Sequence, residues 1–353
     1  MPSNVLAQVG DRYITVDEFV TRAELSPLPN FRSVNGFTDK RGLLELLIGE
    51  KLLANEAEAL GLRRDPAFQT WQRYTERVAV VKELYRDEIL SKVEIREGEI
   101  DTAIALVQKS LPESKPLLTQ SEYLQRRASI KKILRTRRAD ELSDRFVQRF
   151  MSNRNLVLKG KAFSQLAKYI EQRVEFKYLS PVLKMQPLTE VDYRRLEDDL
   201  HSRLDEPLIV FAGGQWSIRE TLEKLRLKEL PLNRESPTAM RNTLRRDLLE
   251  LARDELLAQE GYRRHLDKRP AVQEEVRVWV DHHLYTQMIS RLSLPPQFGA
   301  EIEFPPQIAK LKDKYRVTVA EDKLKQTTLT GINMFAFYPG RPQRLAVPLW
   351  PRF

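Results

Sequence analysis

The chain has 353 residues, 41% hydrophobic and 31% charged, which is enough apolar content for the cores of two ordinary domains. It contains no cysteine, which excludes disulfides, thiolate metal sites and cysteine nucleophiles, and no stretch is apolar enough to predict a membrane span. The formal net charge of +9 predicts attraction to acidic partners, whether nucleic acid, anionic lipid or an acidic polypeptide.

The N-terminal residues predict a strand, a tight turn and two helices. Residues 5–9 alternate in polarity, Gly10-Asp11 suits a hairpin-like turn, and Thr15 is placed to cap a helix that carries Glu18 three residues later. The next helix has an apolar face, and Pro66 starts a further one. That apolar face consists of Leu44, Leu47, Ile48 and Leu52.

The same pattern occurs a second time along the chain. An offset of 202 places residues 9–18 over residues 211–220, with Ser217 as the second cap, and an offset of 204 places residues 50–56 over residues 254–260. The second copy has the same helical apolar face, with Leu248 at the position of Leu44. We therefore expect residues 5–90 and 207–292 to share one architecture: strand, turn, helix, loop, helix, proline and helix.

Between the copies lies the most basic part of the chain. We predict an extended link at residues 93–100, a helix to about residue 111, and a long helix over residues 119–153 that opens with a capping box. Its cations point in different directions, which favours an ordinary solvated helix and makes nucleic acid an unlikely partner, while an acidic client or a lipid surface stays open. The candidate basic rim consists of Arg126, Arg127, Lys131, Arg135 and Arg138.

The remaining segments predict short elements and a C-terminal arm. We expect a strand at 156–158, helices at 161–172 and 189–204, an alternating stretch at 174–179, and a strand at 315–319. One of the strands 156–158 and 317–319 should pair with an N-terminal strand of a module, because short strands are unstable alone. Residues 327–353 are expected to form an extended arm whose aromatic side chains dock on the protein itself or on a partner. These aromatics are Phe335, Phe337, Tyr338, Trp350 and Phe353.

No residue pattern predicts catalysis, a metal or a cofactor. Adjacent His282 and His283 lie on different sides of a helix, and neither they nor His201 and His265 have a ligand spacing. Gly213-Gly214 lacks the remaining residues of a phosphate-binding loop and indicates a turn. We expect no enzyme activity and no cofactor.

The first copy resembles the N-terminal module of the SurA/PrsA family of peptidyl-prolyl isomerase-type foldases. The resemblance rests on the turn and helix start at residues 9–19, the helix pattern at 43–62 and the next helix start at 93–100. Residues 311–319 also resemble the strand that ends such chaperone cores. Family members commonly insert a parvulin domain with paired histidines after the first helices, and here that space holds only residues 111–118. The resemblance implies a duplicated chaperone core without the isomerase.

These observations predict a mainly α protein with a few short strands (α+β). We expect a first SurA-like module at 1–200, a second at 201–326 and the arm at 327–353. The resemblance implies a periplasmic, non-catalytic holdase that binds unfolded polypeptides, such as outer-membrane or secreted proteins, in a cradle between the modules. The alternative is an adaptor subunit of a cell-envelope assembly with one fixed partner. Residues 1–4 show no leader, so we expect either a removed signal peptide or a cytoplasmic protein.

Candidate client-binding residues come from the third helix of each copy and from the proline-rich connector after the second. Adaptable apolar side chains suit a binder that accepts many sequences. The candidates are Trp71, Tyr74, Trp279, Met288, Phe298 and Phe304.

Overall fold

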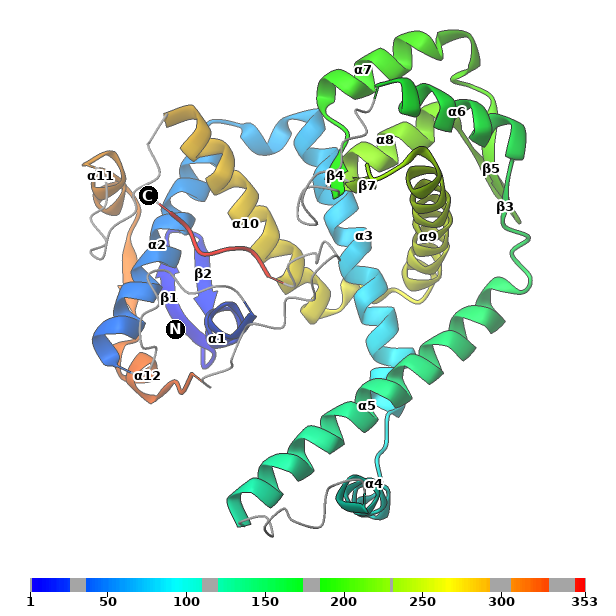
Figure 1. The fold of residues 1–353 in the computed structure, drawn as a ribbon. Coiled ribbons are helices and arrows are strands. Elements are labelled where there is room, and N and C mark those ends of the chain that lie inside the picture. Colours follow the sequence, from blue (N-terminus) through cyan, green and yellow to red (C-terminus); the bar gives the residue numbers. More distant parts are fainter. Residues whose placement is uncertain are drawn as a thin grey trace. The chain divides into compact units, whose positions relative to one another are not determined.

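The computed structural model describes residues 2–25, 36–109, 120–173, 185–228, 231–292, 306–329 and 347–352. Within these ranges the chain is mainly helical, with three small sheets whose order is β2-β1-β8, β3-β5-β6 and β4-β7 (Figure 1). The predicted α+β class is confirmed at this level. The expected stretch 174–179 and the aromatic residues Phe298, Phe304, Phe335, Phe337, Tyr338 and Phe353 lie outside the described residues.

The chain forms two compact units, each built from separate stretches. Unit 1 comprises Met1–Ala79, Leu179–Met185 and Lys268–Phe353, and unit 2 comprises Val80–Tyr178 and Gln186–Asp267. These units differ from the continuous ranges 1–200 and 201–326 expected from the repeat, because the third helix of the second copy belongs to unit 1 and the third helix of the first copy ends in unit 2.

The strands of the two copies match residue for residue. Strands β1 (Val5–Val9) and β2 (Arg12–Thr15) pair antiparallel, and β5 (Pro207–Phe211) and β6 (Gly214–Ser217) pair with the same register 202 positions later. Each hairpin has its register shift at the same place, between Val5 and Ala7 and between Pro207 and Ile209. The two copies therefore share even the same local irregularity in strand pairing.

The helices follow the strands in the same order in both copies. The first copy has α1 (Val16–Leu25), α2 (Phe37–Ala59), the 3-10 turn η2 (Leu62–Arg64) and α3 (Pro66–Glu88). The second has α8 (Ile218–Lys228), α9 (Pro237–Arg263), η5 (Leu266–Lys268) and α10 (Pro270–Leu292). Leu44 and Leu248 are fully buried in the cores of units 1 and 2 respectively, which confirms the predicted equivalence of their environments.

The predicted helix caps are also present, with one difference. The Thr15 and Ser217 hydroxyls accept hydrogen bonds from the backbone N–H groups of Glu18 and Glu220. The Glu220 carboxylate accepts a bond from the Ser217 N–H and completes a capping box. The Glu18 carboxylate instead bonds to Lys51, 2.7 Å away, because buried cations lie within its reach.

Unit 1 is completed by the C-terminal part of the chain. Strand β8 (Val317–Val319) pairs antiparallel with β1, and its neighbours are α11 (Pro306–Lys314) and α12 (Glu321–Gln326). The buried Lys40 ammonium donates to the carbonyls of Lys325 and Thr327 and so holds the end of α12 against α2. Residues from both ends of the chain therefore share one hydrophobic core.

Helix α10 lies along α2 within unit 1 (Figure 1). Its buried residues Leu284, Tyr285 and Met288 belong to the same core as Leu44 and Leu47 of α2. The equivalent residues of α3 by the repeat, among them Val80 and Leu84, are buried in the range of unit 2. Unit 1 thus contains the whole of α10 and the first part of α3, and unit 2 contains the end of α3.

Unit 2 has a corresponding three-stranded sheet and a separate helical core. Strand β3 (Val157–Leu158) pairs antiparallel with β5, so both candidate strands pair with a module's first strand. Helices α6 (Gly160–Arg173), α7 (Glu190–Asp199), α8 and α9 contribute to the core. The smaller elements are η4 (His201–Arg203), β4 (Met185–Pro187) and β7 (Pro231–Asn233).

Helices α4 (Glu97–Lys109) and α5 (Gln120–Met151) form a hairpin that follows the 3-10 turn η3 (Leu90–Lys92) (Figure 1). Its two helices share a small core of their own, in which Ile100, Ile104 and Ile130 are the buried residues. So small a core leaves most of the surface of both helices to solvent.

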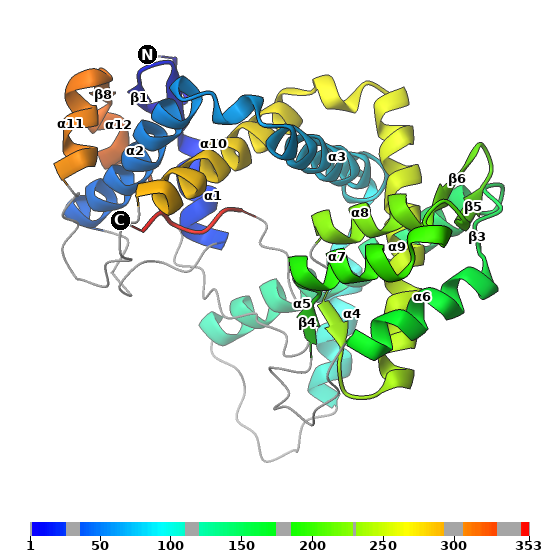
Figure 2. The ribbon, with the colours of Figure 1, turned by 90° about the horizontal axis from the view of Figure 1, so that it is seen from above.

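The C-terminal residues 347–352 dock on unit 1 beside α10 (Figure 2). They have no regular secondary structure, and Trp350 is only 4% exposed. Of the two expected alternatives, docking on the protein itself or on a partner, residues 347–352 show the first.

Candidate functional site

The four described client-binding candidates differ in accessibility, and all belong to unit 1. Met288 and Tyr74 are buried, and Met288 is part of the unit 1 core. Their side chains stabilise the fold and offer no surface to a client, which corrects the prediction for these two residues. Trp71 and Trp279 are half-buried.

Trp71 and Trp279 both contact histidines of α10. The Trp71 ring stacks on His283 with centroids 3.9 Å apart, and the Trp279 ring meets His282 edge-on at 6.5 Å. Burial lowers the pKa of His283 to about 4, and the neighbouring His282 contributes to the shift. His283 is therefore neutral at pH 7 and serves as a packing surface for Trp71.

The candidate basic rim on α5 is largely compensated by the acidic residues of α4. Arg127 bonds to Glu97 and Asp101, Lys131 lies 3.4 Å from Glu97, and Arg138 lies 2.7 Å from Glu99. The hydrogen bonds that Arg127 donates to Asp101 and Glu97 raise the pKa of Arg127. Arg126 is half-buried and Arg135 is exposed. Three of the five predicted cations thus hold the hairpin together.

The hairpin also exposes large apolar side chains. Ile133 is 65% exposed, Leu106 63% and Leu124 54%, and the first two are the most exposed of the large hydrophobic residues identified among the described ranges. Single exposed apolar residues are common on protein surfaces. These three lie on α4 and α5, whose common core contains few buried residues.

A buried network of charges occupies the centre of unit 1, and the sequence analysis did not identify it. The side chains of Glu18, Arg22, Glu50 and Lys51 have no exposed surface. Arg22 donates two hydrogen bonds to Glu50, of 2.7 and 2.9 Å, and Lys51 Nζ lies 2.7 Å from Glu18 and 2.9 Å from Asp281. The network connects α1, α2 and α10.

Cations from neighbouring elements satisfy the remaining oxygens of the network. Arg277 bonds to Glu18 at 2.7 Å and to Asp281 at 3.1 Å, while Arg12 bonds to Asp281 at 2.9 Å. His282 Nδ1 lies 2.8 Å from Glu50. Each buried carboxylate therefore has at least two partners, as buried charges require.

The charge balance keeps these groups ionised. Burial alone would raise the pKa of Glu50, but Arg22, His282 and Lys51 hold it far below its ordinary value. Burial alone would lower the pKa of Lys51, but Asp281, Glu18 and Glu50 raise it. Glu50 with a lowered pKa and Lys51 with a raised pKa both keep their charges near pH 7, as their ion pairs in the core require.

One signal in the sequence marks this network. Lys51 follows Leu44 by seven residues and Leu47 by four, which places a lysine on the apolar face of its helix. A charge at a core position requires a buried partner. The sequence does not show that this partner is Asp281, which lies in the second copy of the repeat.

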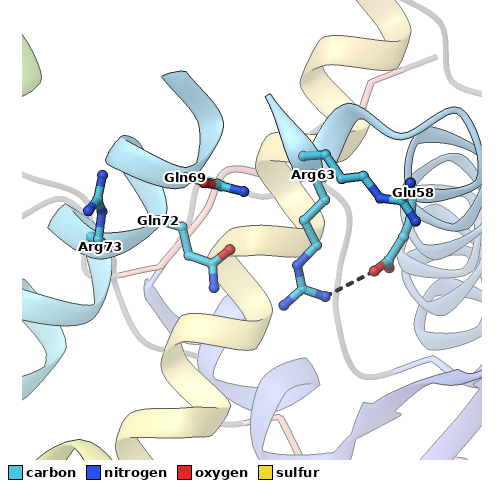
Figure 3. Close-up of a pocket in the computed structure, with 6 residues that line it drawn as sticks. Glu58, Arg63, Gln69, Gln72 and Arg73 are labelled. Atoms are coloured by element: carbon cyan, nitrogen blue, oxygen red, sulfur yellow. Dashed lines mark hydrogen bonds and ion pairs between the residues drawn. The ribbon is translucent and has the colours of Figure 1, made fainter. Parts of the chain in front are cut away.

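A polar hollow of about 640 Å³ lies at the junction of α2 and α3. Figure 3 shows Gln69, Gln72 and Arg73 on α3, with Arg63 bonded to Glu58 across the hollow. Burial alone would raise the pKa of Glu58, but hydrogen bonds from Arg12 and Arg63 hold it below its ordinary value. The Glu58 carboxylate is therefore held in its ionised form by its two arginine partners.

The described residues contain no group of three or more histidine, aspartate and glutamate side chains that could hold a metal ion. His201 Nδ1 lies 3.0 Å from the Asp198 carbonyl, and His265 has a left-handed backbone with φ 58°. No histidine contact described here resembles a ligand set. None of the described helices is both long and apolar enough to cross a membrane.

Comparisons with protein-family models, with curated proteins and with solved structures found no match.

Proposed function

We propose that this protein is a non-catalytic chaperone that holds extended, unfolded polypeptides, of the SurA/PrsA type and without an isomerase domain. The family assignment rests on the residue patterns at 9–19 and 43–62, which belong to matching hairpins and helices in the two copies. The proposal includes a location in the periplasm, with outer-membrane or secreted proteins as clients.

The observation that carries the proposal is the exposed apolar surface of the α4–α5 hairpin. Leu106, Leu124 and Ile133 are each more than half exposed, on helices whose own core contains few buried residues. A client that contributes apolar side chains would remove this surface from water, at about 25 cal/mol per Å² of apolar area. Such contacts require no particular sequence, which suits a binder of many clients.

The exposed charges of the hairpin favour acidic segments within the client. Lys132 and Arg135 are exposed on α5, close in sequence to Ile133. Exposed charges mainly speed the encounter of two chains and contribute little to holding them once bound. We therefore expect higher salt to slow client association while the affinity changes only modestly.

The test is suppression of aggregation when guanidine-unfolded citrate synthase is diluted into buffer with the protein, followed by light scattering. The double variant Leu124→Ser/Ile133→Ser should lose most of the suppression. The matched control Leu60→Ser/Val191→Ser removes two side chains that are 56% and 54% exposed on α2's end and α7, and it should keep the activity. Equal loss in both variants would contradict the hairpin as the carrier of function.

The same experiment separates the chaperone from the adaptor alternative. A chaperone suppresses the aggregation of several unrelated unfolded proteins at similar molar ratios. An adaptor with one fixed partner would suppress none of them, and this result would overturn the proposal.

A further inference from the structure

The C-terminal residues 347–352 pack on unit 1 without regular secondary structure, and the surface that they cover, to which Phe19, Arg22 and Tyr285 contribute, is called the groove. Val347, Pro348, Trp350 and Pro351 are buried, while Leu349 and Arg352 face solvent. Neither proline has an N–H group to donate, so the segment is poorly suited to join a sheet as a strand. Side chains of the groove bind its backbone instead.

Two groove residues bind main-chain atoms of the segment. Arg22 Nη2 donates to the Leu349 carbonyl at 2.5 Å. The Tyr285 hydroxyl donates to the Arg352 carbonyl at 2.6 Å and accepts from the Arg352 N–H at 2.8 Å. Main-chain atoms are common to all sequences, so these contacts do not restrict the groove to its own segment.

The side chain of Trp350, which is 4% exposed, contacts residues of α1. Its ring meets Phe19 edge-on at 6.3 Å, and the Arg22 guanidinium lies 5.8 Å from the ring centroid. The indole Nε1 is buried and has no hydrogen-bond partner among the described residues. A buried donor without an acceptor is unfavourable. The pocket therefore recognises an aromatic ring and gains nothing from the indole N–H, so a phenylalanine of another chain would suit it.

The groove is organised independently of the segment. Glu50 holds the Arg22 guanidinium through two hydrogen bonds within the buried network, and His282 Nδ1 lies 2.8 Å from the same carboxylate. Without the segment, Arg22 would keep its two bonds to Glu50 and would lose the Leu349 carbonyl and the contact with the Trp350 ring. Because Arg22 is already in position to donate, a peptide that replaces the segment does not have to order this side chain.

We propose that this groove is a second client-binding site, which takes an extended segment with an aromatic residue beside proline, and that residues 347–352 are its internal competitor. This inference rests on the proposed chaperone function, since it names a second place where the chaperone binds part of its client. A tethered competitor acts at a millimolar effective concentration, so a client must displace it. The segment thereby lowers the apparent affinity of the groove for a client.

The experiment uses the full-length protein and a fluorescein-labelled peptide with the sequence of residues 347–352, followed by fluorescence anisotropy. Trp350→Ala weakens the internal competitor and leaves the groove residues unchanged. Its affinity for the peptide should be at least about tenfold higher than that of the wild type, because a larger fraction of molecules has an open groove. A peptide with phenylalanine in place of the tryptophan should still bind, and one with alanine should not.

Two results would overturn the proposal. One is a folded Trp350→Ala protein, judged by circular dichroism, that binds the peptide no better than the wild type. The other is a concentration-dependent dimer of the wild type that Trp350→Ala abolishes, because the groove would then serve exchange between two copies of this chain.

A second measurement does not depend on the stability of that variant. A peptide with photoreactive benzoylphenylalanine at the tryptophan position is irradiated in excess with the wild-type protein. Label should appear on the tryptic peptides that contain Phe19 or Tyr285, and label elsewhere would contradict the groove. This outcome is independent of the aggregation assay, so failure of the groove and failure of the hairpin can be told apart.

Discussion

Lys51 on α2 and Asp281 on α10 form a buried ion pair, with Nζ 2.9 Å from Oδ2, that joins the first copy of the repeat to the second within unit 1. At the equivalent positions of the repeat stand Glu255 and Arg77, which carry the opposite signs, so Lys51 would meet a like charge if α3 took the place of α10. The pair therefore distinguishes α10 from α3 as the partner of α2.

Removing this lysine should strongly destabilise unit 1. Lys51→Met leaves Glu18 and Asp281 buried with one cation fewer, so we expect the free energy of unfolding to fall by about 3–5 kcal/mol. Urea unfolding followed by tryptophan fluorescence measures this, since Trp71, Trp279 and Trp350 all belong to unit 1. The control Arg194→Met breaks an exposed pair with Glu190 and should change stability by less than about 0.5 kcal/mol.

Gly261 on α9 is required by its contact with α3 in unit 2. A methyl group at Gly261 would overlap Val80 Cγ1, so Gly261→Ala should lower the melting temperature of unit 2. The double variant Gly261→Ala/Val80→Ala should recover part of the loss, because it removes the overlapping methyl groups. The control Gly98→Ala has open space around it and should be neutral or slightly stabilising. Additive losses in the double variant would show that the two residues do not touch.

His283 should make stability depend on pH below neutrality. Burial lowers the pKa of His283 from 6.5 to about 4, so the unfolded chain binds a proton that the folded protein excludes between these values. The contribution is fully present above pH 6.5 and is lost as the pH falls towards 4. We expect His283→Phe, which keeps a ring against Trp71, to flatten the decline of unfolding free energy between pH 7 and 5. His201→Gln, which replaces an exposed histidine, should leave the fall in unfolding free energy between pH 7 and 5 unchanged.

Deleting residues 311–353 should destabilise the fold, because β8 pairs with β1 and Leu324 and Trp350 are buried in the unit 1 core. A milder form of the test is Leu324→Ala, for which we expect a loss of about 2–5 kcal/mol at a fully buried site. Leu349→Ala, at a side chain 41% exposed, should cost far less. Unchanged thermal stability on deletion would count against this role of the C-terminal residues.

We expect no prolyl isomerase activity, because no histidine pair with an acid in a parvulin-like pattern occurs in the sequence. Refolding of a proline-limited substrate should proceed at its uncatalysed rate, with slower aggregation. Acceleration above background that scales with protein concentration would overturn this expectation.

Local structure could be predicted from the sequence because its causes are local. The 3.6-residue spacing of Leu44, Leu47 and Leu52, the caps at Thr15 and Ser217, and the proline at position 66 each act within a few residues. The duplication then allowed the second copy to be placed from the first. For the third strand of each sheet, the sequence offered residues 156–158 or 317–319, and both pair with a first strand, one in each unit.

The pairing of distant segments was decided only in three dimensions. Both third helices carry equivalent apolar faces, so periodicity alone does not say which copy each one completes, and the choice depends on long-range contacts such as Lys51 with Asp281 and Gly261 with Val80. The same distinction between local and long-range causes applies to the residues around Trp350. The sequence marked Trp350 as a residue that must dock or bind something, but only the fold brings Phe19, Arg22 and Tyr285 around its segment, because Phe19 and Arg22 lie on α1, Tyr285 lies on α10, and packing brings these two helices together.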